Sequence, residues 1–313
     1  MVEMNSHTHR RYQRDRVSEV VFENWVALVN LSAGQLRNPA ALGQLLEWLD
    51  EAGIGVIETC SVDAASAFIR DRTELSGVIV CGGDGTVFSA LNSMDLRRQR
   101  LAIVPCGRGN SVARDLGIET PGQAFAAFHQ RRFRELDVIR VSLHGDEFGV
   151  KECLALNGVA FGALPRAILR ANTLCHLGQV GYAIGGLTNW ISPTEYEIQL
   201  DSHQKRLEKL CGVTVLNTRH LGKYVPIDAG DPTDRKLEVV FHSPNPFRAK
   251  FSELALVAGF GMSNALAAQS EAVTIRCREH NPVYVDGDVV PNVSSATLHC
   301  QPAAVQCLVR ETE

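Results

Sequence analysis

The feature that most constrains the fold is an apolar run, residues 77–80, that leads directly into the glycine-rich residues 81–86. An apolar run that ends in glycines and opens into an amphipathic segment is typical of a buried strand, a tight turn and a helix. The segment after the glycines has apolar residues at helical spacing, namely Val87, Ala90, Leu91 and Met94. The pattern therefore predicts a strand, turn and helix in this order.

The chemistry of this turn is set by its glycines and by Asp84. Glycines let the backbone approach a bound group, and the N-terminus of the following helix offers unpaired N–H groups and a partial positive charge, which suits a phosphate. The Asp84 carboxylate would repel a phosphate unless it holds a metal ion or accepts a proton from an attacking hydroxyl. The turn therefore favours a phosphoryl-transfer site, although a glycine turn with a solvent-facing Asp would explain this stretch alone equally well.

A second glycine turn follows the next apolar run. Residues 101–104 are strand-like, residues 105–111 contain Gly107 and Gly109, and residues 112–116 form a helical stretch closed by Gly117. Because open α/β sheets bind ligands at the carboxyl ends of their strands, we expect both turns to lie side by side at that edge. The pair is much more specific for a ligand site than either turn alone.

Both turns resemble the signatures of one family, the diacylglycerol kinase catalytic domain superfamily, which includes bacterial lipid kinases and sphingosine kinases. Residues 82–86 are similar to its nucleotide-phosphate motif and residues 105–118 to its second signature. The resemblance extends over residues 25–309, with further motif matches at Asn30 (in 30–34), Thr59, Asn157, Gly162, Asn217 and residues 286–288.

The resemblance implies an ATP-dependent kinase that acts with Mg²⁺ on a lipid hydroxyl, diacylglycerol-like or sphingoid. Asp84 is the first candidate for the base or metal-linked acid, and Asp286 and Asp288 come next. The resemblance also places a metal-binding loop at residues 231–234, with Asp234 as side-chain ligand and Asp231 beside it. The expected nucleotide-binding residues are Asn30, Thr59, Gly82, Gly83, Gly85, Thr86, Gly107, Arg108, Gly109 and Asn110.

Three of these assignments have a structural alternative. The step from Asp286 to Gly287 between alternating runs is also a standard hairpin turn. Arg108, where the family more often has Thr or Ser, could clamp phosphates or point into solvent. The acids of residues 231–234 could be solvated turn residues, since Arg235 stands where the family has Gly.

Further departures from the family bear on the acceptor more than on the nucleotide turn. Phe88 and Ser89 replace a common Asn-Glu pair, Ser111 replaces a frequent Asp, and Asp288 replaces a Glu. The departures favour a loss of catalysis, and the missing Asn-Glu pair counts against an NAD kinase, but three other functions stay open. They are an NAD kinase, which shares the first glycine turn, a kinase of a small non-lipid alcohol, and a nucleotide-binding protein without catalysis.

The hydrophobic period changes near residue 134. Before it, strand-like runs alternate with helical segments, which predicts a parallel sheet covered by helices. After it, apolar and polar residues alternate, which is typical of antiparallel strands. We expect a disordered tail at 1–22, a nucleotide-binding α/β domain of Rossmann-like and NAD-kinase-like type at 23–134, and a β-rich, sandwich-like lipid or substrate domain at 135–313, with the last residues able to return to the first domain.

One helical stretch, residues 164–191, interrupts the β-rich half. A helix packed on the sheet explains its small and apolar residues. It could also form a wall of a lipid-tail pocket, with Arg166 and Arg170 facing head groups; Tyr182 and Trp190 complete the larger side chains of this stretch.

Composition excludes several classes of protein. The 313 residues carry a formal net charge of −4, which argues against general nucleic-acid binding. The nine cysteines include no Cys-x-x-Cys pair, so we expect reduced, mostly core cysteines in a cytoplasmic protein and no zinc site. Residues 1–16 are basic without an apolar stretch and no run reaches about 18 apolar residues, so neither a signal peptide nor a membrane span is expected. The expected partner is a lipid alcohol, with peripheral membrane contact; a homodimer is compatible with the sequence.

Overall fold

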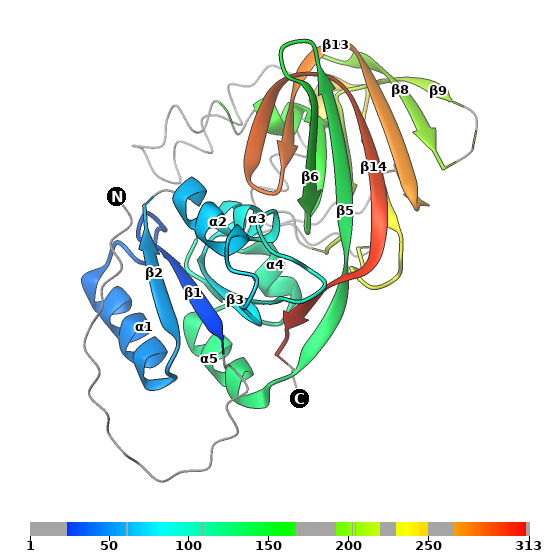
Figure 1. The fold of residues 1–313 in the computed structure, drawn as a ribbon. Helices are drawn as coiled ribbons and strands as arrows, with labels where there is room; N and C mark the ends of the chain where they lie inside the picture. Colours follow the sequence, from blue (N-terminus) through cyan, green and yellow to red (C-terminus); the bar gives the residue numbers. More distant parts are fainter. Residues whose placement is uncertain are drawn as a thin grey trace. The chain divides into compact units, whose positions relative to one another are not determined.

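The computed structural model divides the chain into two compact units, residues 1–134 with 305–313, and residues 135–304 (Figure 1). The chain passes from one unit to the other within strands β5 (Phe133–Gly145) and β14 (Asp288–Leu308). The structure describes residues 24–60, 62–107, 109–166, 169, 192–201, 203, 205–219, 230–249 and 266–310.

The first unit is built on a parallel sheet. Its strands lie in the order β2-β1-β3-β4, and Cys307 near the end of β14 pairs in parallel with Leu101 of β4. Every residue of β3 is buried, as expected for a strand covered on both faces. The strand bounds are β1 (Trp25–Asn30), β2 (Gly55–Thr59), β3 (Gly77–Gly82) and β4 (Arg100–Pro105).

Helices follow the strands of this sheet. Helix α5 begins with a capping box, in which the Thr120 side chain accepts from the Gln123 N–H and the Gln123 side chain accepts from the Thr120 N–H. Helix α1 packs against α5 through Trp48 and Phe125, whose rings stack with centroids 4.2 Å apart, while α2 packs on α3. The helices are α1 (Pro39–Glu51), α2 (Val62–Arg70), α3 (Asp84–Leu91), α4 (Ser111–Asp115) and α5 (Pro121–Gln130).

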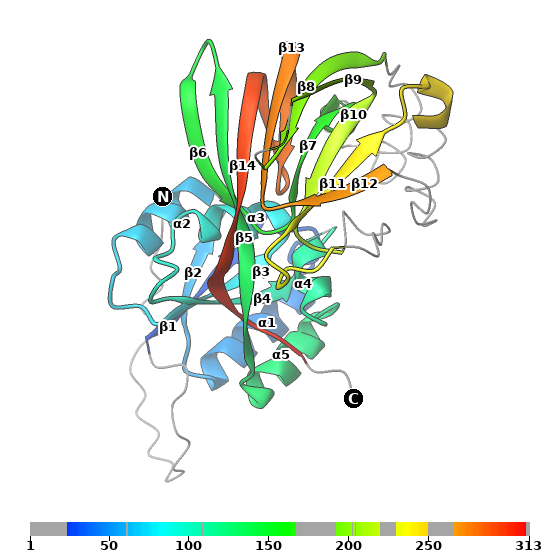
Figure 2. The same cartoon turned by 90° about the vertical axis from the view of Figure 1, so that its right-hand side faces the viewer.

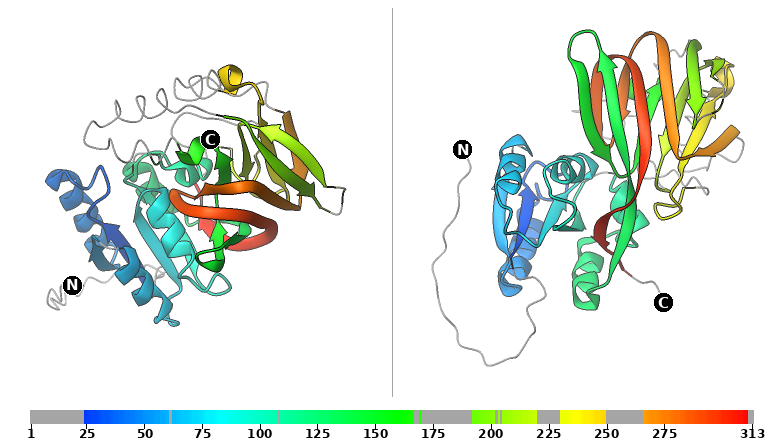
Figure 3. Two further views of the ribbon diagram at one scale, coloured as in Figure 1. Left: turned by 90° about the horizontal axis from the view of Figure 1, so that it is seen from above. Right: turned by 45° about the vertical axis from the view of Figure 1, so that its right-hand side comes forward.

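The second unit is an antiparallel sheet. Its central ladder runs in the order β12-β11-β10-β7-β13-β14, with the β8–β9 hairpin added on β13 and the β5–β6 hairpin added on β14 (Figures 2 and 3). Its further strands are β6 (Gly149–Ala155), β7 (Gly158–Gly162), β8 (Thr194–Leu200), β9 (Arg206–Leu210), β10 (Gly212–Leu216), β11 (Leu237–His242), β12 (Leu266–Ser270) and β13 (Ala272–Val285).

The predicted fold class, a parallel α/β sheet followed by an antiparallel β-rich part, is confirmed. The four apolar residues predicted at helical spacing after the first glycine turn are all buried, although Met94 lies beyond the end of α3. The described cysteines are only partly core residues: Cys60, at a bend after β2, is exposed, three are half-buried (Cys153, Cys277 and Cys300), and four are buried (Cys81, Cys106, Cys211 and Cys307). Of the predicted helical stretch 164–191, the described residues 163–166 and 169 are helical, whereas Arg170, Tyr182 and Trp190 lie outside the described residues. Across the described part of the chain, no helix combines the length and apolar character needed to cross a bilayer.

Candidate active site

The two glycine turns lie side by side at the carboxyl ends of β3 and β4, as the sequence predicts. The Gly82 carbonyl oxygen accepts from the Cys106 N–H at 2.9 Å and from the Gly107 N–H at 3.2 Å. A β-carbon on Gly107 would lie 2.4 Å from the Cα of Gly83, so only glycine permits this approach. The two turns therefore form one interlocked backbone structure.

The second turn is closed by the side chain of Asn110. Its Oδ1 accepts from the Gly107 N–H at 3.0 Å, and its Nδ2 donates to the Gly107 carbonyl at 3.0 Å. Asn110 itself adopts the left-handed conformation, with φ 55°, at the start of α4. The Gly107 N–H is therefore engaged within the protein, and the role of Gly107 in nucleotide binding stays a prediction. Gly109 belongs to the same turn and its carbonyl accepts from Arg114, whereas Arg108 lies outside the described residues.

Asp84 is the first residue of α3, and its carboxylate joins the first turn to the second. Its Oδ1 accepts from the Val112 N–H at 3.4 Å, at the N-terminus of α4. Burial raises the pKa of the Asp84 carboxyl, while the N–H groups of Val112, Ser111 and Asn110 and the Arg114 guanidinium oppose the rise. The carboxylate is thus held in place, and a raised pKa brings it closer to the range in which a general base works at neutral pH.

Thr86 is a buried residue of the first turn, and its amide and its hydroxyl have different partners. The N–H groups of Thr86 and Val87 both donate to the Gly83 carbonyl, at 2.9 and 3.1 Å, and close the first turn of α3. The Thr86 N–H is therefore used within α3, and the binding of a nucleotide by Thr86 stays a prediction. The Thr86 hydroxyl oxygen accepts from Asn30 Nδ2 at 2.8 Å, which connects α3 to the end of β1.

The remaining nucleotide-site residues of the first unit gather at the same edge of the sheet. Asn30 and Thr59 are the last residues of β1 and β2 and pair with each other in register. Thr59 is buried, and its carbonyl accepts from the Leu31 N–H at 3.0 Å. Because β1, β2, β3 and β4 are adjacent and parallel, the sheet places Asn30, Thr59 and both glycine turns at one edge. Gly82, Gly83 and Gly85 all belong to the first of these turns.

Asp286, in the second unit, has a structural environment. It is buried, and its carboxylate accepts from the N–H groups of Asn157 and Gly158 and from that of Leu156. With φ values of 43° and 101°, Asp286 and Gly287 form the hairpin turn between β13 and β14. This carboxylate therefore fixes the backbone of residues 156–158, and its role as a base stays a prediction.

Asp288 differs from Asp286 in its surroundings. It is exposed at the first position of β14, and its Oδ1 accepts from the N–H of the next residue, Val289, at 2.9 Å. Nothing else among the described residues engages this carboxylate. Its side chain is therefore accessible, which the role predicted for it requires.

The loop of residues 231–234 contains two carboxylates that each stabilise a local turn. Asp231 Oδ1 accepts from the N–H and the hydroxyl of Thr233, at 3.0 and 2.7 Å, and Asp234 Oδ1 accepts from the Lys236 N–H at 2.9 Å. Arg235 has φ 66°, which explains why glycine is favoured there.

The loop of residues 231–234 supplies some, but not all, of the oxygen ligands that a hard cation such as Mg²⁺ requires. Within the described residues, the second oxygen of each carboxylate, on Asp231 and Asp234, has no hydrogen-bond partner, and carboxylate oxygen is a ligand that Mg²⁺ and Ca²⁺ prefer. No group of three or more His, Cys, Asp or Glu side chains able to hold a metal occurs in the part of the chain that the structure describes. The remaining ligands would be carbonyls and water.

Asp137 is a residue of this region that the sequence analysis missed. It is buried, accepts from the N–H groups of Arg235 and Ala303 at 2.7 and 2.8 Å, and donates its own N–H to the Pro232 carbonyl at 2.7 Å. Asp137 therefore holds the 231–235 loop in place. The available signal was an acid between Leu136 and Val138 in an apolar strand, where only a hydrogen-bonded carboxylate is tolerated.

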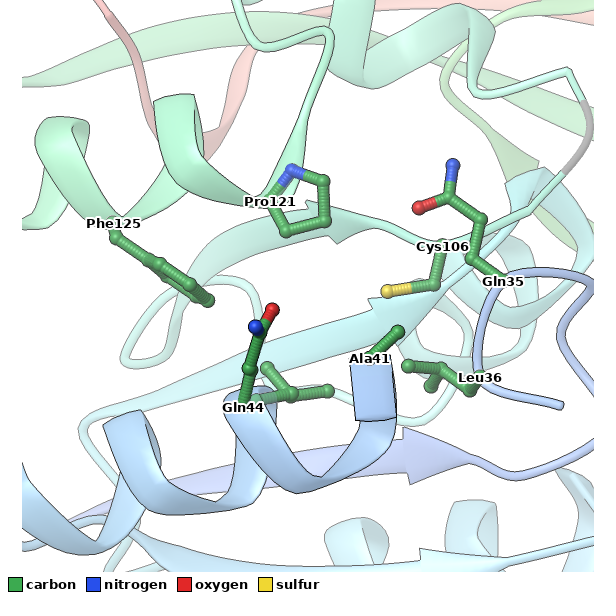
Figure 4. Close-up of a pocket in the computed structure, with 8 residues that line it drawn as sticks. Gln35, Leu36, Ala41, Gln44, Cys106, Pro121 and Phe125 are labelled. Carbon is green, nitrogen blue, oxygen red and sulfur yellow. The ribbon is translucent and has the colours of Figure 1, made fainter. Parts of the chain in front are cut away.

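A small pocket borders the second glycine turn at Cys106 (Figure 4). Its volume is about 70 Å³, far below the several hundred Å³ of a typical ligand pocket. The Cys106 Sγ points into it, and burial raises the pKa of this thiol to about 12. The residues that line the pocket are Gln35, Leu36, Ala41, Gln44, Leu45, Cys106, Pro121 and Phe125. The pocket is too small for a nucleotide and contains none of the predicted site residues.

Comparison with known proteins agrees with the resemblance seen in the sequence. The diacylglycerol kinase catalytic domain matches residues 24–141, which contain both glycine turns. A diacylglycerol kinase of Mycobacterium tuberculosis is 26% identical over 299 residues, which cover 90% of this chain and 94% of the relative. Human diacylglycerol kinase kappa is 31% identical over 109 residues, which cover 34% of this chain and 7% of the human protein.

Solved structures show the same fold. A diacylglycerol kinase from Bacillus anthracis str. Sterne has a TM-score of 0.71 at 19% identity, with 93% of this chain and 98% of the other covered. An NAD kinase from Archaeoglobus fulgidus, solved in complex with ATP, has a TM-score of 0.53 at 12% identity, with 92% and 94% covered.

Proposed function

We propose that the chain transfers the γ-phosphate of ATP to a lipid hydroxyl, on the basis of the match between residues 24–141 and the diacylglycerol kinase catalytic domain. The observation that carries the proposal is the interlocking of the two glycine turns around Asp84. Phosphoryl transfer depends mainly on positioning and on charge neutralisation, and these turns combine close backbone approach with one oriented carboxylate.

Asp84 would act as the base in this reaction. The acceptor hydroxyl oxygen attacks the γ-phosphorus, its proton passes to the Asp84 carboxylate, and the bond to the β-phosphate oxygen breaks to release ADP. The pKa of Asp84, raised by burial, makes it a stronger proton acceptor than an exposed Asp. The amides at the start of α4 keep its carboxylate in a fixed direction.

Bound Mg²⁺ would supply charge neutralisation on the transferred phosphate. In the second unit, Asp231 and Asp234 would hold a cation through their second carboxylate oxygens, with backbone carbonyls and water as further ligands. The Asp137 carboxylate would support this loop from behind through the Arg235 N–H.

A lipid acceptor implies contact with a membrane surface, which we propose is peripheral and occurs from the cytoplasm. Diacylglycerol-like and sphingoid alcohols share a hydroxyl beside an apolar tail. Separate micelles that contain one or the other alcohol distinguish between these two acceptors.

The proposal is tested by ADP release from ATP and Mg²⁺ in the presence of mixed micelles that contain a lipid alcohol. We expect micelles with the alcohol, but not plain detergent micelles, to stimulate ADP release. Asp84→Asn should reduce the stimulated rate by about 10²-fold or more, the scale for a lost acid or base. Asp71→Asn, at an exposed position after α2, is the matched control and should keep the wild-type rate.

Two results would contradict the proposal. One is an Asp84→Asn variant that turns over like the wild type, which would remove Asp84 from the mechanism. The other is stimulation by NAD alone, which would instead favour the NAD kinase alternative.

A further inference from the structure

The contact between Asn30 and Thr86 has a direction that bears on nucleotide binding. Asn30 Nδ2 lies 2.8 Å from the Thr86 hydroxyl oxygen. An amide NH₂ group only donates, so the hydroxyl oxygen accepts in this contact, and the proton of the hydroxyl must point away from Asn30.

The orientation of the Asn30 amide is determined by a second contact. Its Oδ1 accepts from the Ser32 N–H at 2.9 Å. The reversed amide would place its NH₂ group against this N–H, with two donors facing each other. The nitrogen of Asn30 therefore belongs on the side of Thr86.

Within the described residues, the two local acceptors for the Thr86 hydroxyl proton are already occupied. A threonine in a helix normally donates to the carbonyl three or four residues earlier, which here are those of Gly83 and Gly82. The Gly83 carbonyl already accepts from the N–H groups of Thr86 and Val87, and the Gly82 carbonyl already accepts from those of Cys106 and Gly107. A carbonyl oxygen has two lone pairs, so the Gly83 carbonyl is fully used, and the Gly82 carbonyl is occupied by the Cys106 N–H and by the Gly107 N–H, which it shares with Asn110 Oδ1.

We infer that Asn30 is a positioning residue that directs the Thr86 hydroxyl proton to a phosphate oxygen of the bound nucleotide. The Thr86 N–H is used within α3, so the hydroxyl is the hydrogen-bond donor that this residue has left. The hydroxyl packs over Gly82, where a β-carbon would lie 2.6 Å from Oγ1, so a glycine is needed for it to sit there. The inference rests on the proposed function, because it requires a nucleotide at this edge of the sheet.

Asn30→Asp is the sharpest perturbation of this contact. The carboxylate keeps the size of the side chain and the acceptor for the Ser32 N–H, but it replaces the donor by an acceptor. The Thr86 hydroxyl would then donate its proton to this carboxylate and direct a lone pair toward the phosphate. Because a hydrogen bond to a charged group is lost, we expect the Kd of Mg-ATP to rise about tenfold or more.

The experiment is a double-mutant cycle on the Kd of Mg-ATP, measured by calorimetry without any acceptor. Its members are the wild type, Asn30→Asp, Thr86→Val and the double variant. We expect Thr86→Val to weaken binding about tenfold, and Asn30→Asp to add less than about twofold once the hydroxyl is gone. Thr86→Ser, which retains the hydroxyl, should retain the full effect of Asn30→Asp.

A charge control separates this effect from simple repulsion. Asn38→Asp makes the same change nearby in the chain, at the cap of α1, where Oδ1 accepts from the Ala40 N–H. It should leave the Kd within about twofold. In turnover assays, Asn30→Asp should raise KM for ATP and leave kcat nearly unchanged, which a merely misfolded variant would not do.

The outcomes distinguish a failure of the inference about Asn30 from a failure of the proposed function. An Asn30→Asp effect of equal size with and without the Thr86 hydroxyl would overturn the inference and leave the proposed function standing. A wild-type protein that binds neither ATP nor ADP would overturn the proposed function, and the inference with it.

Discussion

The contact between the two glycine turns predicts that Gly107→Ala destabilises the first unit by about 2–4 kcal/mol. The new β-carbon would lie 2.4 Å from Gly83 Cα and 2.8 Å from Asn110 Oδ1, whereas ordinary van der Waals contact begins at 3.4 Å. The nearest atom belongs to the backbone, so a turn must move by about 1 Å. Such overpacking costs roughly 1–3 kcal/mol. Loosening the hydrogen bonds between Gly107 and Asn110 adds about 1 kcal/mol.

Gly85→Ala is the matched control for this prediction. A β-carbon there meets nothing within 4 Å, and Gly85 lies in the first turn of α3. Alanine in a helix is favoured over glycine by up to about 1 kcal/mol, so this variant should be as stable as the wild type or more stable. Urea unfolding followed by tryptophan fluorescence would measure both, since Trp25 and Trp48 lie in the first unit. Equal midpoints for Gly107→Ala and the wild type would refute the packing of one turn on the other.

Three further changes test individual residues. Burial raises the pKa of Asp84 in the folded chain, so an ionised Asp84 lowers the stability of the fold above that pKa. This loss of stability disappears as the pH falls below the pKa that Asp84 has in the unfolded chain. Asp84→Asn should therefore have a higher Tm than the wild type at pH 7 and an equal Tm at about pH 3. Asp286→Asn should destabilise the second unit by roughly 1.5–3 kcal/mol, because an amide cannot accept from all the N–H groups that the carboxylate satisfies, whereas the exposed Asp288→Asn should stay within about 0.5 kcal/mol; urea midpoints compare the two. Thr120→Ala should cost about 1 kcal/mol through loss of the α5 capping box, and an unchanged midpoint would contradict that role.

The parts of the fold that depend on local patterns could be predicted from the sequence. The α5 capping box needs only Thr120 and Gln123, and the antiparallel strands follow from a period of two. The adjacency of the two glycine turns could also be predicted, because strands of one parallel sheet end at the same edge.

The parts that depend on contacts between distant residues could not be predicted. Asp137 binds the N–H groups of Arg235 and Ala303, which are far from it in the chain, and no local pattern indicates this. Likewise, the three N–H groups around the Asp286 carboxylate come from residues 156–158. A motif indicates which residues gather, whereas these hydrogen bonds decide which donors remain for a ligand.

The same limit applies within the nucleotide turns. The glycines at 82, 83 and 107 indicate close backbone approach, yet part of that approach is between the turns themselves. The Gly107 N–H is used by the Asn110 side chain and the Thr86 N–H by the Gly83 carbonyl. Only the three-dimensional arrangement separates these internal uses from donors that a phosphate could use.

The most direct test of the central claim is transfer of radiolabelled γ-phosphate from ATP with Mg²⁺ to a panel of micellar lipid alcohols, a total membrane extract and NAD. We expect label in an organic-extractable product, and the alcohol that accepts it identifies the substrate class. Label that appears only in NADP, or no transfer to any acceptor while ATP still binds, would contradict this claim.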